Sequence, residues 1–142
     1  MLYFCQFVVL LVHHMDEELY KENILDRYKH PRRKSVPEKH DIHEGGVNAT
    51  CGDNLIVFLS FDDNGNISDA HWDGEGCAIS QASADMLMDK IIGKSMESIG
   101  EISEENMREM LGIEIGPSRE KCAYLPINTL RRWLGEPGFG PV

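Results

Sequence analysis

Three cysteines and one aspartate carry most of the chemistry that this 142-residue chain could perform. Cys51, Cys77 and Cys122 lie far apart in the sequence, and Asp53 follows the first of them by two positions. Cysteine thiolates bind zinc and iron, and zinc also accepts a carboxylate oxygen in a tetrahedral site. Iron in clusters prefers a fourth thiolate, so an oxygen ligand favours easy release of a cluster. The four residues form a candidate metal-ligand set, although isolated cysteines without a Cys-x-x-Cys pair are also often buried apolar residues.

The predicted surroundings of the cysteines favour the negatively charged thiolate. Cys77 stands at the start of one predicted helix and Cys122 in the first turns of another, where free N–H groups and the helix dipole stabilise an anion. Lys121 adds a neighbouring cation. Gly52 and Gly76 would let the backbone approach a cluster closely and donate N–H groups to its sulfides.

The elements that must position these residues follow from the spacing of apolar side chains. Helical spacing predicts helices over residues 16–29, 78–92, 103–111 and 118–134. Branched and aromatic residues predict a strand over residues 54–61, alternation predicts one over 67–72, and a weak third strand, interrupted by Gly45 and Gly46, is expected around 41–48. A turn is expected at 62–66 and an extended loop at 30–40. The sequence therefore predicts an α+β fold, in which helices flank a small three-stranded antiparallel sheet.

Other residue types are interpreted as structural. Isolated histidines that do not pair at ligand spacing are expected at the surface or in packing contacts: His30, His40, His43 and His71. Methionines at helical spacing are expected to fill the core: Met86, Met88, Met107 and Met110.

Composition excludes several classes of protein. The formal net charge of −10 and the lack of a long basic run argue against a nucleic-acid binder. The short basic cluster at residues 29–34 is either a docking patch for an acidic partner or a solvated turn. Four widely spaced cysteines do not suggest a disulfide framework, so we expect reduced thiols in the cytoplasm. No apolar stretch reaches the roughly 20 residues that a membrane span needs, and no membrane association is expected.

Residues 1–14 form an apolar leader that lacks the basic start and cleavage site of a signal peptide. Either Met15 is the true start of the protein, which we favour, or the leader is an additional packing element. Cys5 lies in this leader and receives no role. We expect one domain over residues 15–135 and a loose Gly/Pro-rich tail at 136–142.

Four motifs in order resemble the iron–sulfur cluster assembly scaffold family that comprises IscU, SufU and the N-terminal domain of NifU. The resemblance covers about residues 16–134. It rests on Tyr28–Arg32, on Thr50–Asp53 with its Cys-Gly-Asp core, on Gly74–Ala84 around Cys77, and on Lys121–Ala123.

The resemblance implies a SufE/NifU-like fold and a scaffold rather than a turnover enzyme. Such proteins take sulfur from a cysteine desulfurase, build a [2Fe–2S] cluster and pass it to apo-proteins. It assigns the ligand role to Cys51, Asp53, Cys77 and Cys122, and it suggests Cys122 as the persulfide acceptor. A homodimer or higher oligomer sharing a cluster is a further expectation.

Departures from the family pattern keep a second reading open. Lys121 stands where IscU has histidine, as in SufU-like members, and the IscU chaperone signal "LPPVK" is replaced by Ile115–Glu120. The 44 residues between Cys77 and Cys122 leave no room for the SufU insertion. The alternative is therefore a zinc-dependent sulfur acceptor, a SufU-like sulfurtransferase that holds Zn²⁺ on the same four residues and stimulates a desulfurase. The remaining alternative is an unrelated domain whose cysteines are structural.

Overall fold

A computed structural model of the chain describes residues 18–49 and 52–135. The expected leader at 1–14, the expected tail at 136–142 and Cys51 lie outside the described residues. A helix covers residues 18–29. The other elements, in chain order, are β1 (Ile42–Asn48), β2 (Asp53–Phe61), β3 (Ile67–Glu75), α2 (Ala78–Ile91), α3 (Met96–Gly100), α4 (Glu104–Leu111) and α5 (Glu120–Trp133).

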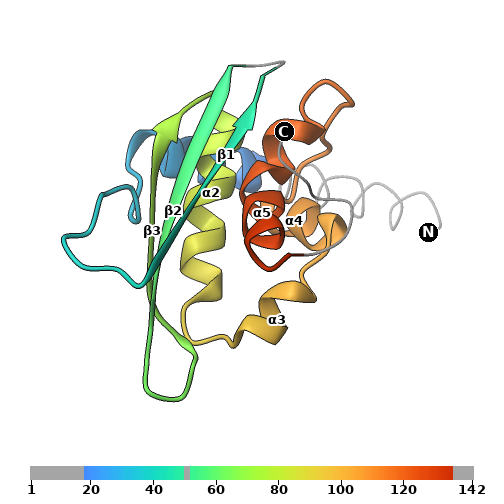
Figure 1. The fold of residues 1–142 in the computed structure, drawn as a ribbon. Coiled ribbons are helices and arrows are strands. Elements are labelled where there is room, and N and C mark those ends of the chain that lie inside the picture. Colours follow the sequence, from blue (N-terminus) through green and yellow to red (C-terminus); the bar gives the residue numbers. More distant parts are fainter. Residues whose placement is uncertain (1–17, 50–51, 136–142) are drawn as a thin grey trace, which may run out of the picture.

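The three strands form one antiparallel sheet in the order β1-β2-β3 (Figure 1). In β2 every second side chain points toward the helices, and those of Leu55, Val57 and Leu59 are buried. The register shifts between Ser60 and Phe61, close to the turn that leads into β3. The predicted α+β fold with a three-stranded antiparallel sheet is confirmed.

Helices α2 and α5 cover one face of this sheet, with α2 against β3 and α5 against β1 and β2 (Figure 1). Small side chains in α2, among them Ala82 and Ala84, are fully buried and let α5 come close. The Ser83 hydroxyl donates a hydrogen bond of 2.6 Å to the Ala123 carbonyl of α5. This buried bond fixes the first turns of the two helices relative to each other.

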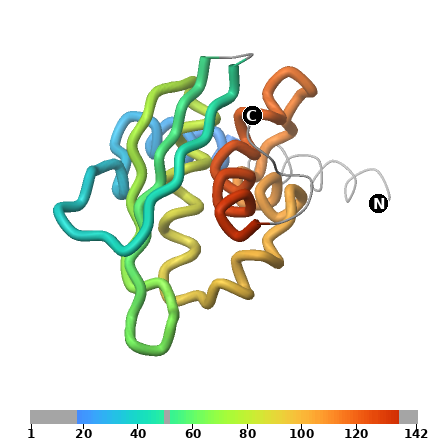
Figure 2. The backbone as a smooth tube through the Cα atoms, viewed as in Figure 1, coloured from blue at the N-terminus to red at the C-terminus, as the bar shows by residue number. Residues whose placement is uncertain are grey.

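Three chain segments meet at one end of the molecule (Figure 2). They are the start of β2, the junction between β3 and α2, and the first turn of α5. Asp53, Cys77 and Cys122 each lie in one of these segments. The fold thus brings the predicted ligands of the described part of the chain to a common place.

Helix α5 contains a proline in its interior, Pro126. Proline has no N–H, so it cannot donate the helical hydrogen bond to the carbonyl four residues earlier, which belongs to Cys122. The helix nevertheless continues to Trp133 because its apolar face is buried, with Ile127 and Leu130 fully covered.

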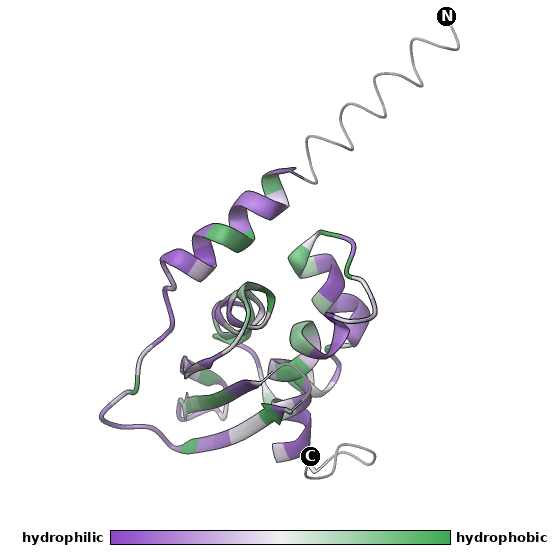
Figure 3. Cartoon of the chain, turned by 90° about the horizontal axis from the view of Figure 1, so that it is seen from above, coloured by the Kyte–Doolittle hydropathy of each residue, from purple (hydrophilic) through white to green (hydrophobic). Residues whose placement is uncertain are grey.

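The helix at residues 18–29 lies at the edge of the molecule and is largely hydrophilic (Figure 3). Ile24 is its buried apolar residue, whereas Leu19 and Leu25 are exposed. Tyr20 packs over Gly112, the left-handed residue that ends α4, and leaves no room there for a Cβ atom.

Two features differ from the sequence-based expectation. Helix α3 was not predicted, because five residues are too short for a periodic pattern to stand out. The expected loop at 30–40 is held against β3: the Trp72 N–H donates to the Arg33 carbonyl (2.9 Å), and the Ser35 N–H donates to the Trp72 carbonyl (3.0 Å).

The four methionines that were expected to fill the core are buried in it or packed against it: Met86, Met88, Met107 and Met110. In the described part of the chain, no helix combines the length and the apolar character that crossing a membrane requires.

Candidate metal centre

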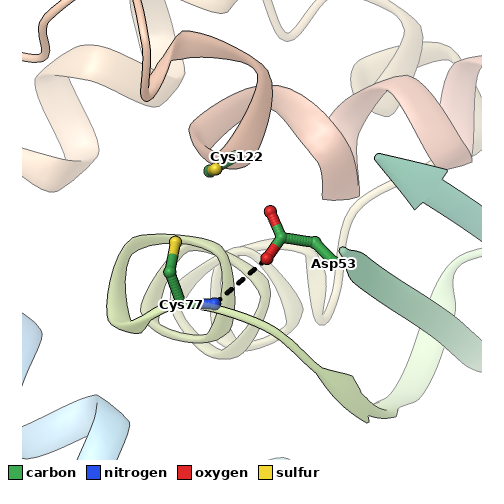
Figure 4. Close-up of side chains that lie close together, drawn as sticks. All are labelled: Asp53, Cys77 and Cys122. Atoms are coloured by element: carbon green, nitrogen blue, oxygen red, sulfur yellow. Dashed lines mark hydrogen bonds between the residues drawn. The ribbon is translucent and has the colours of Figure 1, made fainter. Parts of the chain in front are cut away.

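Asp53, Cys77 and Cys122 converge in the structure as the sequence predicted (Figure 4). One carboxylate oxygen and the two sulfur atoms all lie within 4.8 Å of one another. A tetrahedral metal ion with bonds of about 2.0–2.3 Å would hold such atoms less than about 4 Å apart. A contraction of about 1 Å would therefore be enough to form a site.

The Asp53 carboxylate is fixed by the start of α2. Its Oδ1 atom accepts a hydrogen bond of 3.0 Å from the backbone N–H of Cys77, which is the N-cap residue of that helix (Figure 4). The free N–H groups and the dipole of a helix N-terminus stabilise a carboxylate. Asp53 is nevertheless fully buried, with no ion pair to any described residue.

A buried carboxylate without a cationic partner is costly. Hydrogen bonds alone compensate Asp53 within the described residues, and two sulfur atoms lie beside it. Such a donor set gains a large stabilisation from a metal cation, whose charge compensates the carboxylate and the thiolates together. The residues that are present therefore fit zinc or iron.

Gly76 makes the close approach of Asp53 to α2 possible. A Cβ atom at this position would lie 2.5 Å from Asp53 Oδ1 and would also collide with the Ser80 hydroxyl. The sequence suggested that Gly76 admits a cluster, and in the structure this glycine packs against one of the candidate ligands. A side chain larger than hydrogen would displace the carboxylate.

Hydrogen bonds also shape the turn around Cys77. The Ser80 hydroxyl donates to the Cys77 carbonyl (3.0 Å), and the Gln81 amide donates to the Gly76 carbonyl (2.8 Å). The Cys77 sulfur lies 3.9 Å from the Ser80 oxygen. These contacts fix the turn that carries Cys77 and leave this residue partly exposed.

Asn48 was missed by the sequence analysis and lies directly beside two of the candidate ligands. It is the last residue of β1, it pairs in register with Asp53, and it is 6% exposed. Its Nδ2 atom lies 3.4 Å from Asp53 Oδ2 and 3.7 Å from Cys122 Sγ. The register is the signal that could have revealed it, because the antiparallel pairing of β1 with β2 places these two residues opposite each other.

The two cysteines differ in accessibility. Cys122 is fully buried in the first turn of α5, whereas Cys77 is only partly buried. Lys121, beside Cys122, is exposed. A reactant that reaches this site therefore meets Cys77 first, and Cys122 requires a local movement before it can react.

The motif at residues 28–32 serves a different place in the fold. The buried Asp85 carboxylate of α2 accepts hydrogen bonds from the backbone N–H groups of Arg32 (3.1 Å) and Arg33 (2.8 Å). The Trp72 indole (3.0 Å) and the Arg27 guanidinium (2.9 Å) also donate to it. The basic cluster at 29–34 is thus partly an internal anchor, which neither sequence interpretation foresaw.

Asp89 continues this anchor one turn later. It pairs with Arg27 (2.6 Å) and with Arg33 (2.9 Å). Burial raises the pKa of the Asp89 carboxyl, but the hydrogen bonds from Arg33 and Arg27 outweigh burial, so its pKa lies below the usual value. Both arginines therefore hold the segment after the first helix to α2.

None of the four histidines that the sequence analysis considered, His30, His40, His43 and His71, belongs to the candidate metal centre. His40 and His43 pack around Phe58 on the outer face of the sheet, with ring nitrogens 3.1 Å apart. His71 bonds to Asp69 (2.7 Å) and to Ser35 (3.0 Å). The interpretation of these three as surface and packing residues agrees with their contacts.

Comparison with known proteins identifies relatives of the chain. The model of the family described as "NifU-like N terminal domain" matches residues 19–135. The chain is 33% identical to the iron–sulfur cluster assembly scaffold protein IscU of Thermotoga maritima, over 82% of this chain and 92% of that protein. It is 32% identical to the zinc-dependent sulfurtransferase SufU of Bacillus subtilis, over 84% of this chain and 92% of that protein.

Solved structures share the fold. A crystal structure from Fervidobacterium islandicum, described as an iron–sulfur cluster assembly scaffold protein for the SUF system, superposes with a TM-score of 0.65 at 33% identity. That match covers 78% of this chain and 93% of the other. A NifU-like N-terminal protein from Brucella abortus gives a TM-score of 0.65 at 18% identity, over 87% of this chain and 95% of the other, and supports the fold alone.

Proposed function

The chain belongs to the NifU-like N-terminal domain family, and on that premise we propose that it assembles a [2Fe–2S] cluster on Cys51, Asp53, Cys77 and Cys122. It is an iron–sulfur cluster assembly scaffold, related over most of its length to proteins of that name. The single observation that supports the choice of ligands most strongly is the convergence of Asp53, Cys77 and Cys122 at one end of the fold. Cys51, which lies outside the described residues, precedes Asp53 by two positions and is the proposed fourth ligand.

The proposed ligand set suits a cluster that must be passed on. Thiolates bind iron strongly, whereas a carboxylate oxygen is a weaker ligand for a cluster. Asp53 can also turn back to the Cys77 N–H, with which it is bonded in the structure. A ligand that has an alternative partner leaves the iron at lower cost, so Asp53 is the ligand at which we expect release to begin.

The sulfur source is proposed to be a cysteine desulfurase, and the acceptors are apo-proteins that need the cluster. Cys122 remains the proposed persulfide acceptor: its thiolate attacks the outer sulfur of the desulfurase persulfide, and the desulfurase leaves as a thiolate. The buried position of Cys122 requires the first turn of α5 to move for this step. Because free thiolates need a reducing compartment, we propose that the protein works in the cytoplasm.

Zinc-dependent sulfur transfer is the second candidate function. It is favoured by the SufU relative at 32% identity and by Lys121, which stands where IscU has histidine. Zinc would be held by the same three cysteines and Asp53, since it accepts this set of ligands in a tetrahedron. Both functions use one site, and they differ in whether the cargo is a cluster or a single sulfur atom.

Anaerobic reconstitution distinguishes the scaffold function from zinc-dependent sulfur transfer. The full chain carrying Cys5→Ser, which removes a thiol of no assigned role, is incubated with ferrous iron and sulfide and then with an apo-ferredoxin. A visible chromophore that transfers to the ferredoxin, and that is lost in Cys77→Ser, supports the scaffold function. A colourless protein that retains zinc and stimulates a desulfurase would instead favour sulfur transfer. If the protein forms no chromophore and does not stimulate a desulfurase, both candidate functions are refuted.

A further inference from the structure

The Asn48 amide is placed between two candidate ligands of different chemistry. Its nitrogen lies 3.4 Å from an Asp53 carboxylate oxygen and 3.7 Å from the Cys122 sulfur. An amide NH₂ group has two hydrogens, so one nitrogen can donate to both neighbours at once. A carboxylate and a thiolate accept hydrogen bonds, and the amide oxygen turned toward them would be repelled. The NH₂ orientation follows from this chemistry.

Burial makes these contacts costly to lose. Asn48 is 6% exposed, and a buried amide donor without a partner costs about 1–3 kcal/mol. The pairing of β1 with β2 fixes the Asn48 backbone opposite Asp53. The sheet therefore fixes the backbone from which the Asn48 amide reaches its two partners.

The two thiols of the described site have different environments. The Cys122 sulfur faces the Asn48 amide donor. The nearest hydroxyl to the Cys77 sulfur belongs to Ser80, and that hydroxyl donates to the Cys77 carbonyl rather than to sulfur. A hydrogen bond to a thiolate withdraws electron density and weakens its donation to a metal. The two thiolates should therefore bind a metal with unequal strength.

We propose that Asn48 is a positioning residue of the metal centre, which orients Asp53 and Cys122 together and makes Cys122 the weaker thiolate ligand. This inference rests on the proposed function, because it assumes that the two residues bind a metal. It gives a chemical reason why Cys122 rather than Cys77 would leave the metal to accept sulfur. With a metal bound, the partly buried Cys77 would be the thiolate that holds it more strongly, and Cys122 would be the one freed for sulfur transfer.

Cobalt binding tests the proposal without measuring cluster assembly. The full chain and Asn48→Leu, which keeps the number and branching of the side-chain heavy atoms, is somewhat larger and removes both donors, are titrated anaerobically with Co²⁺. We expect the thiolate-to-cobalt charge-transfer band of the variant to move to longer wavelength, since an unbonded thiolate gives up electron density more easily. We expect its Co²⁺ affinity to fall by about 10-fold, the low end of the typical loss when a partner of a metal ligand is removed, because the stronger donation of the unbonded Cys122 thiolate offsets part of the lost orientation of Asp53 and Cys122.

Asn54→Leu is the matched control. Asn54 is exposed on the neighbouring strand, and its side chain accepts a hydrogen bond from the Glu75 N–H (3.2 Å) instead of contacting the ligands. This variant should keep the band position of the unmodified chain. Asn48→Gln, which retains the amide, should lie closer to the unmodified chain than Asn48→Leu does.

The outcomes separate this inference from the proposed function. If the unmodified chain binds Co²⁺ and Asn48→Leu shows the same band and affinity, Asn48 has no positioning role, and the ligand assignment stands. If the unmodified chain binds no Co²⁺ and forms no cluster, the metal centre itself is refuted. Circular dichroism verifies folding; if Asn48→Leu fails to fold, Asn48→Ala removes the same donors and is expected to show the same band shift.

Discussion

Asp85 is the anchor of the segment that joins the first helix to the sheet, and its replacement by asparagine tests that assignment. The carboxylate is fully buried and accepts hydrogen bonds from Arg27, Arg32, Arg33 and Trp72. Asp85→Asn keeps the shape of the side chain. It removes the negative charge and replaces one acceptor oxygen by an NH₂ group that faces other donors.

The expected loss follows from these contacts. Breaking a buried ion pair by neutralising one partner costs about 3–5 kcal/mol. Arg27 keeps Asp89 as a second partner at 2.6 Å, so the lower end of that range, about 3 kcal/mol, applies here. For a domain of this size, each kcal/mol lowers Tm by about 2–4 °C, and we expect a fall of about 6–12 °C.

Thermal unfolding by circular dichroism measures the loss, with Asp63→Asn as the control. Asp63 is exposed in the turn before β3, so its charge can be removed at a cost within about 0.5 kcal/mol. Co²⁺ affinity at low temperature should stay unchanged in Asp85→Asn, because Asp85 lies two turns from Cys77 along α2. An unchanged Tm combined with lost desulfurase stimulation would refute this reasoning and identify the segment as a docking surface.

Three further predictions concern the metal centre and its support. Asp53→Ala should still form a cluster and release it more slowly, because the weakest ligand is gone; faster transfer to an apo-ferredoxin would contradict this. Gly76→Ala should weaken Co²⁺ binding and cost about 1–3 kcal/mol of stability, since its Cβ atom would meet Asp53 Oδ1 at 2.5 Å; wild-type affinity would show that the carboxylate can move away freely. The lowered pKa of Asp89 means that its ion pairs stabilise the fold above the ordinary carboxyl pKa of about 4 and lose this effect as pH falls through the lowered value. The unmodified chain should therefore exceed Asp89→Asn in unfolding free energy by about 1 kcal/mol, and this difference should be constant from neutral pH to about pH 5 and shrink below pH 4. A difference that grows in acid would mean that the pKa of Asp89 is raised rather than lowered.

The sequence predicts those parts of the fold that depend on local periodicity. The run of branched and aromatic residues in β2 and helical spacing in α2 place these elements within one or two residues of their observed bounds. The attachment of residues 30–37 could not be predicted. It depends on Asp85, more than 50 positions away, and no local pattern identifies a buried carboxylate as the acceptor for a distant loop.

In the candidate site, too, the sequence predicts some residues and not others. Cysteines and a neighbouring aspartate stand out by their chemistry, and their places at the ends of elements predict that they meet. Asn48 does not stand out, since an asparagine before a short connection is expected to form a turn. Its role became visible only when the register of β1 and β2 placed it opposite Asp53.

Pro126 has a consequence for how sulfur could reach a buried thiol. An ordinary helix resists fraying at its first turn through N–H···O bonds to the residues that follow, and Pro126 removes the bond that would hold the Cys122 carbonyl. Peeling that turn away from the sheet therefore breaks one bond fewer, while Ile127 and Leu130 keep the rest of the helix seated in the core. Of the two thiols in the described part of the chain, the more enclosed one therefore lies on a turn of α5 whose ladder of backbone hydrogen bonds is one bond short.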